Sequence, residues 1–117
     1  MTLEEVARRL GEDGFVVLDV RSLREYTGEA VAPCDPRPGR IPGARHLDVS
    51  ELLGLPAEQI RAKLGPPEGQ ELVTYCHSGS RSSLATFALR TAGYRARNYA
   101  GSWHEWSRHD DLPLERG

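Results

Sequence analysis

The 117-residue chain is poor in cysteine, in excess charge and in long apolar runs. Cys34 and Cys76 are its only cysteines and form no C-x-x-C pair, which excludes the cysteine-dense frameworks of small secreted domains. A formal net charge of −2 argues against a general nucleic-acid or anionic-membrane surface. No apolar run approaches the length of a membrane span. We therefore expect no nucleic acid and no membrane among its partners.

Metal-ligand spacing is also missing. The sequence predicts no metal and no cofactor, because no spacing typical of ligands connects the four histidines His46, His77, His104 and His109. The N-terminus, M-T-L-E-E, is acidic and lacks the basic and apolar regions of a signal peptide, so a cytoplasmic location is expected. With 38% hydrophobic and 27% charged residues, the composition is that of an ordinary globular protein, and residues 1–117 are expected to form one domain.

Apolar segments alternate with amphipathic ones along the chain. Strands are expected at residues 15–20, 44–47, 72–75 and 95–99. Capping-box pairs predict helices after Thr2, Ser22 and Ser102, whose partners are Glu5, Glu25 and Glu105. Further helices are expected at 50–53, 56–64 and 82–92, the last apolar around most of its circumference and therefore packed on several sides. This order predicts an α/β fold with a mainly parallel central sheet and helices on both faces.

Segment 27–43 is irregular and contains four prolines, at 33, 36, 38 and 42. A loop of this length in a small domain is usually functional or bound to a partner.

The most informative stretch is 71–83, E-L-V-T-Y-C-H-S-G-S-R-S-S. An apolar strand leads into Cys76, a short loop follows, and then a helix begins. Unpaired backbone N–H groups and the helix dipole stabilise an anion at such a place, so they favour thiolate over thiol. Cys76 is therefore the candidate nucleophile.

The loop at 76–81 resembles the active-site loop of the rhodanese, or sulfurtransferase, family. Four residues separate Cys76 from Arg81, whereas phosphatases and arsenate reductases with similar loops have five and cradle a tetrahedral oxyanion. The tighter ring of N–H groups suits a persulfide better than a phosphoryl group. The spacing therefore favours sulfur chemistry over these two alternatives.

Other short motifs extend the resemblance over most of the chain. L-D-V-R at 18–21, G-R-I-P-G-A at 39–44 and A-G-Y at 92–94 are similar to family landmarks, with Arg40 in place of the usual histidine. E-Y-T-G-E at 25–29 and G-S-W-H-E-W at 101–106 resemble the catalytic C-terminal half of two-domain thiosulfate and 3-mercaptopyruvate sulfurtransferases. In that family the other half helps to wall the active site. The chain contains no counterpart of that half, so monomer and homodimer both stay open.

The resemblance implies that Cys76 attacks the outer sulfur of a donor such as thiosulfate, or 3-mercaptopyruvate, and becomes a persulfide. Cyanide, a small thiol or a protein then accepts the sulfur. Arg81 is expected to orient the anionic donor, or to shape the loop through an ion pair, and Gly79 to permit an unusual backbone conformation. Ser82 is expected to cap the helix. The remaining loop residues are expected to supply N–H groups, and their side chains either to bind an oxyanion or to face solvent: His77, Ser78 and Ser80.

Five further residues have predictions of their own. Asp19 and Arg21 are expected to form a structural ion pair beside the site. Trp103 and Trp106 are expected in the core, with pocket lining as the alternative. Cys34 is expected to be incidental, the alternative being a resolving thiol.

A persulfide carrier or interaction module with little turnover is the main alternative function.

Overall fold

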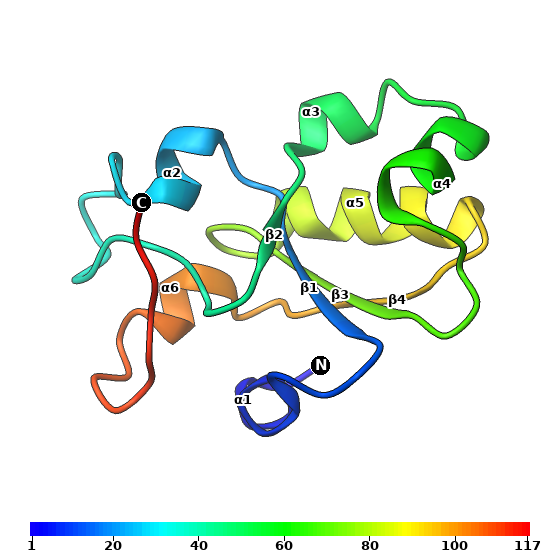
Figure 1. The fold of residues 1–117 in the computed structure, drawn as a ribbon. Helices are drawn as coiled ribbons and strands as arrows, with labels where there is room; N and C mark the ends of the chain where they lie inside the picture. The colour runs from blue at the N-terminus through cyan, green and yellow to red at the C-terminus, as the bar shows by residue number, and fades with distance from the viewer.

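A computed structural model describes all residues, 1–117. Its centre is a sheet of four parallel strands in the order β2-β1-β3-β4 (Figure 1). The strands are β1 (Phe15–Asp19), β2 (Arg45–His46), β3 (Glu71–Tyr75) and β4 (Arg95–Asn98). All four expected strands are present, and β1 and β3 lie in the middle, where near-continuous apolar sequences belong.

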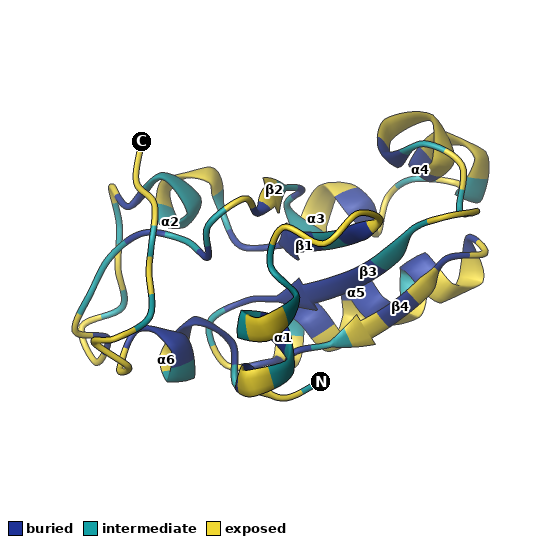
Figure 2. Cartoon of the chain, turned by 60° about the horizontal axis from the view of Figure 1, so that its bottom comes forward, coloured by how far each residue is buried: buried dark blue, intermediate teal, exposed yellow.

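Six helices connect and cover the strands. They are α1 (Leu3–Arg9), α2 (Leu23–Thr27), α3 (Val49–Leu52), α4 (Ala57–Leu64), α5 (Ser80–Thr91) and α6 (Ser102–Trp106). Figures 1 and 2 show α3, α4 and α5 on one face of the sheet, and α1 and α6 on the other. The predicted parallel sheet with helices on both faces is therefore confirmed. None of the helices has both the length and the apolar character needed to cross a membrane.

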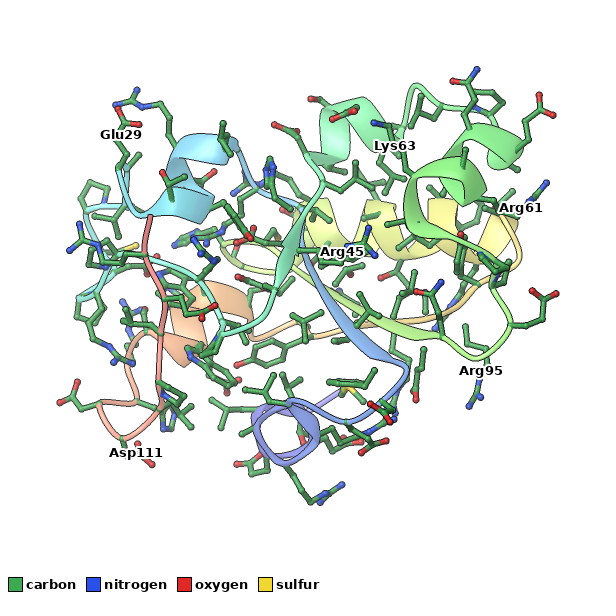
Figure 3. All side chains as sticks on the ribbon, viewed as in Figure 1. Glu29, Arg45, Arg61, Lys63, Arg95 and Asp111 are labelled. Atoms are coloured by element: carbon green, nitrogen blue, oxygen red, sulfur yellow. The ribbon has the colours of Figure 1, made fainter.

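Two hydrophobic clusters fill the spaces between the sheet and its helices. One joins Leu18 and Leu72 of the sheet to Leu52 of α3 and Leu89 of α5. Trp103 and its neighbour Trp106 belong to the other, together with residues of α1. Charged side chains of both signs are spread over the exterior, where Figure 3 shows Glu29, Arg61, Lys63, Arg95 and Asp111.

Helix α5 differs from the prediction in two ways. It begins at Ser80, after an N-cap at Gly79, so Ser82 lies inside the first turn and does not cap the helix. It is also not packed on all sides, because the side chains of Leu84 and Phe87 are exposed. The apolar residues of the segment are not confined to its contact face, because Ala85 lies on that face while Leu84 and Phe87 lie on the exposed part of the helix.

Two of the three predicted capping boxes are confirmed, those of Thr2 and Ser22. The third, at Ser102, is wrong. Helix α6 has its N-cap at Gly101, and the Ser102 hydroxyl accepts a hydrogen bond from the Cys76 N–H and donates one to the carbonyl of Tyr99. Ser102, the first residue of this S-x-x-E pattern, therefore bonds to the backbone of Cys76 and does not cap the helix.

Segment 27–43 is anchored to the C-terminal part of the chain. The guanidinium of Arg37 donates hydrogen bonds to the carbonyls of Ser107, His109 and Leu112. In the opposite direction, the indole N–H of Trp103 donates a hydrogen bond to the carbonyl of Arg37, over 2.8 Å. The proline-rich segment is therefore held against α6, which places its residues beside the active-site loop.

A buried ion pair connects this segment to the sheet. Asp19, at the end of β1, and Arg21 are 0% and 2% exposed, and their charged atoms lie 2.6 Å apart. The Tyr75 hydroxyl donates to Asp19, and Arg21 donates to the carbonyl of Gly39. The expected structural pair thus joins two central strands and the proline-rich segment at one point.

The change Asp19→Asn should lower the free energy of unfolding by about 3–5 kcal/mol, because it leaves the Arg21 guanidinium buried without a counter-charge. Urea unfolding measures this loss. The control Glu51→Gln removes an exposed pair with Lys63 and should cost no more than about 1 kcal/mol. Equal losses in the two variants would contradict a special role of the buried pair.

Candidate active site

Cys76 directly follows β3, and the chain folds back around its sulfur before α5 begins. The N–H groups of Gly79 and Ser82 donate hydrogen bonds to Sγ, over 3.1 and 3.4 Å. The Ser82 hydroxyl lies 3.4 Å from the same sulfur. Cys76 is buried, so these groups replace water around Sγ.

Opposing effects act on the Cys76 thiol. Burial raises its pKa, because a desolvated thiolate is costly. The hydroxyl of Ser82 and the N–H groups of Ser82, Gly79 and Ser78 lower it by stabilising the anion. Together these hydrogen bonds outweigh the effect of burial, so the pKa of Cys76 lies below its usual value. The site therefore eases ionisation of the Cys76 thiol, which is the direction that the strand–loop–helix pattern predicts.

Gly79 makes this loop conformation accessible. Its φ is +99°, in the left-handed region that side chains rarely adopt. A Cβ at this position would also lie only 2.8 Å from the carbonyl oxygen of Ala100. Both reasons exclude a side chain, so Gly79 lets the loop turn tightly enough for its N–H to reach the Cys76 sulfur.

Helix α6 fixes the other side of the loop. Besides the Cys76–Ser102 hydrogen bond of 3.1 Å, the N–H of Trp103 donates to the carbonyl of Cys76, at 3.0 Å. The N–H of His104 donates to the carbonyl of His77, at 2.9 Å. These backbone contacts hold the nucleophile in place before any substrate arrives. The sequence predicted Ser102 only as a helix cap, and its contact with Cys76 was missed.

Arg81 forms an ion pair with Glu25 of α2, with guanidinium–carboxylate distances of 3.0 and 3.3 Å. The hydrogen bond that Arg81 donates to Glu25 raises the pKa of Arg81. Burial raises the pKa of Glu25, but the hydrogen bonds from Arg81 and Ser22 outweigh it, and the net shift is downward. Of the two predicted roles, the ion pair is thus present. It also holds the guanidinium beside the loop while leaving its side chain 37% exposed.

The other loop side chains point away from the sulfur. Ser78 and Ser80 are exposed, and the His77 ring lies against Asp35, with 3.0 Å between Nε2 and Oδ2. Trp103 and Trp106 are fully buried in the core beneath α6, as favoured, and line no hollow. The three hollows of the surface lie elsewhere, near His46, near Leu10 and near Phe87. None of the three is lined by a residue of the loop.

One group of possible metal ligands is assembled next to the loop by Cys34, Asp35, His77 and His104. The prediction of no metal site relied on spacing along the chain, which cannot detect ligands contributed by three separate segments.

Residues 2–109 match the family model described as a rhodanese-like domain. The chain is 35% identical to a thiosulfate sulfurtransferase of Azotobacter vinelandii, over 92% of the chain and 42% of the relative. It is 39% identical to a probable 3-mercaptopyruvate sulfurtransferase of Pseudomonas aeruginosa, over 93% of the chain and 42% of the relative.

A third relative is a sulfur carrier protein, TtuD, of Thermus thermophilus, which is 35% identical over 93% of the chain and 44% of the relative. Among solved structures, that of a probable thiosulfate sulfurtransferase superposes with a TM-score of 0.84 at 45% identity. It covers 98% of this chain and 46% of its own. The chain thus spans less than half the length of each of these proteins.

The change Ser82→Ala should raise the pKa of Cys76, because it removes the hydroxyl beside the sulfur. The pH dependence of iodoacetamide alkylation of Cys76, in a Cys34→Ser background, measures this pKa. Ser83→Ala is the matched control, since Ser83 is exposed and none of its contacts reaches the sulfur. An unchanged profile in Ser82→Ala would show that the hydroxyl does not stabilise the thiolate.

Proposed function

This chain belongs to the family of rhodanese-like domains, and on that premise we propose that it transfers a sulfane sulfur through a persulfide on Cys76. The observation that carries the proposal is the convergence of the Gly79 and Ser82 N–H groups on a buried sulfur whose pKa is lowered. Such a nest stabilises a negative sulfur, whether thiolate or persulfide anion.

Thiosulfate is the first donor we propose, and 3-mercaptopyruvate the second. The Cys76 thiolate attacks the outer sulfur of thiosulfate, a new S–S bond forms, and sulfite leaves with the electrons of the bond that breaks. An acceptor nucleophile (cyanide, a small thiol or a protein thiol) then takes the outer sulfur and regenerates the thiolate. The two half-reactions predict ping-pong kinetics.

The loop itself supports sulfur over phosphoryl chemistry. The ring of N–H groups closes on Sγ over 3.1–3.4 Å, so its donors already contact the sulfur of Cys76. A phosphatase loop instead needs room for a tetrahedral oxyanion beyond the sulfur. The four-residue spacing between Cys76 and Arg81 leaves a smaller ring, which fits one additional sulfur.

Arg81 is the residue we propose to orient the anionic donor. The Arg81 guanidinium donates two hydrogen bonds to Glu25, which hold the side chain in one position. Less conformational entropy is therefore lost when its remaining N–H groups bind an anion.

A sulfur carrier with little turnover is the second candidate. The carrier relative favours it, and so does the lack of a surface hollow lined by the loop, because a protein acceptor needs no enclosing pocket. A persulfide that forms rapidly, but is released to cyanide and small thiols slowly, would support the carrier over the enzyme.

Incubation of the reduced protein with thiosulfate should add the mass of one sulfur atom, and Cys76→Ser should gain none. Intact-mass spectrometry measures both, and Cys34→Ser is the matched control that should still gain the sulfur. Sulfite release should fall at least about 1000-fold in Cys76→Ser, because the nucleophile is gone. A gain in Cys76→Ser, or turnover of an aryl phosphate by the parent protein, would contradict the proposal.

Arg81→Ala should raise the KM for thiosulfate at least about tenfold, since a hydrogen bond to a charged group contributes about 1.5–3 kcal/mol. Arg24→Ala is the control, because Arg24 is exposed on the same helix as Glu25 and pairs only with Glu29. Steady-state sulfite release at varied thiosulfate measures both. An unchanged KM in Arg81→Ala would limit Arg81 to shaping the loop.

A further inference from the structure

Four side chains from three segments meet beside the active-site loop. Cys34 and Asp35 come from the proline-rich segment, His77 directly follows the nucleophile, and His104 lies on α6. One potential ligand atom from each residue can be chosen so that all four lie within 4.8 Å of one another. The group comprises one thiol, one carboxylate and two imidazoles, which is a donor set typical of zinc.

The distances suit tetrahedral coordination. His77 Nε2 is 3.0 Å from Asp35 Oδ2 and 3.7 Å from the sulfur of Cys34. His104 Nδ1 is 3.3 Å from Asp35 Oδ1, and the Cys34 sulfur is 3.8 Å from that oxygen. Zinc bonds of about 2.0–2.3 Å at tetrahedral angles separate neighbouring ligand atoms by about 3.3–3.6 Å. Since one ligand atom of each residue lies within 4.8 Å of the others, side-chain movements of about 1 Å bring the four residues around one ion.

Asp35 provides the independent sign that a cation belongs here. Its side chain is only 1% exposed, yet its Oδ2 atom has no hydrogen-bond partner. That oxygen faces the His77 ring nitrogen at ion-pair distance without hydrogen-bond geometry. A buried carboxylate oxygen without a partner is costly. A cation bound between the oxygen and the ring nitrogen removes that cost.

Arg108 supports the carboxylate from outside. It donates to Asp35 Oδ1 over 3.0 Å and also hydrogen-bonds the backbone carbonyls of Cys34 and His104. Outer contacts of this kind orient ligands around metal ions. The guanidinium thus holds three of the four ligand-bearing positions in register.

We propose that Cys34, Asp35, His77 and His104 form a binding site for one divalent zinc ion. The Cys34 thiol loses its proton to solvent on binding, so thiolate and carboxylate balance the two charges of the ion and no electron is transferred. Access is open, because Cys34 is exposed and the His104 side chain is 47% exposed. Four protein ligands close the coordination sphere, which makes the site structural.

The ion would link the proline-rich segment, the active-site loop and α6. Because His77 is bonded to the nucleophilic Cys76, zinc also limits how far this loop moves. In this site Cys34 is a zinc ligand, which is a different role from accepting sulfur. This inference does not depend on the proposed sulfur transfer, since none of its ligands is the nucleophile.

The test uses the full chain with Cys76→Ser, so that zinc cannot bind the active-site thiol. Calorimetric titration of the reduced, metal-free protein with zinc should give one ion per chain. Thermal unfolding at zinc a hundred times above its Kd should shift upward by on the order of 10 °C. Cobalt in place of zinc should show the absorption bands of a tetrahedral site with a thiolate ligand.

The added changes Cys34→Ser and His104→Ala should each weaken zinc binding at least about tenfold. His109→Ala, which alters an exposed histidine outside the group, is the matched control and should leave the affinity unchanged. Cys34→Ser should also remove the thiolate band of cobalt. No stoichiometric binding, or binding that survives both ligand changes, would overturn the proposal. Neither result bears on the proposed sulfur transfer by Cys76, because the test protein lacks that thiol.

Discussion

The carboxylate of Asp19 is a full charge buried at the centre of this small domain, and several segments are arranged around it. Arg21 neutralises it, and Tyr75, the residue before the nucleophile, donates its hydroxyl to it. The same hydroxyl accepts the N–H of Ile41, and Arg21 reaches the carbonyl of Gly39. A buried charge tolerates few alternative arrangements, because each lost partner costs several kcal/mol. The network therefore fixes where β3 ends and where the proline-rich segment lies.

The reactive sulfur depends on this fixed frame. Cys76 is desolvated, which opposes the thiolate, so the anion exists only if the N–H groups of Gly79 and Ser82 are already aimed at it. Their direction follows from the left-handed conformation of Gly79 and from the backbone contacts with α6. Preorganised donors of this kind act without reorganisation during reaction. The stability of the frame and the chemistry of the sulfur are thus two consequences of the same arrangement.

Much of this could be predicted from the sequence because local signals and burial agree. Strand β3 with Cys76 at its end, and the capping boxes of Thr2 and Ser22, are written in contiguous residues. The failures share one cause, which is tertiary contact. Ser102 has the spacing of a helix cap but serves the Cys76 N–H, and Ser82 faces the sulfur instead of capping α5. Similarly, no pattern along the chain brings Cys34 and Asp35 to His77.

The most direct test of the account follows the amide resonances of Gly79 and Ser82 by NMR through a pH titration of the reduced protein. If their N–H groups stabilise the sulfur anion, both resonances should shift in one step with the same apparent pKa, below the usual value of a cysteine thiol. Addition of thiosulfate should move them again, and the resonance of Ser83 should move much less. If the Gly79 and Ser82 resonances stay in place while Cys76 ionises, the loop does not stabilise the anion and the account is wrong.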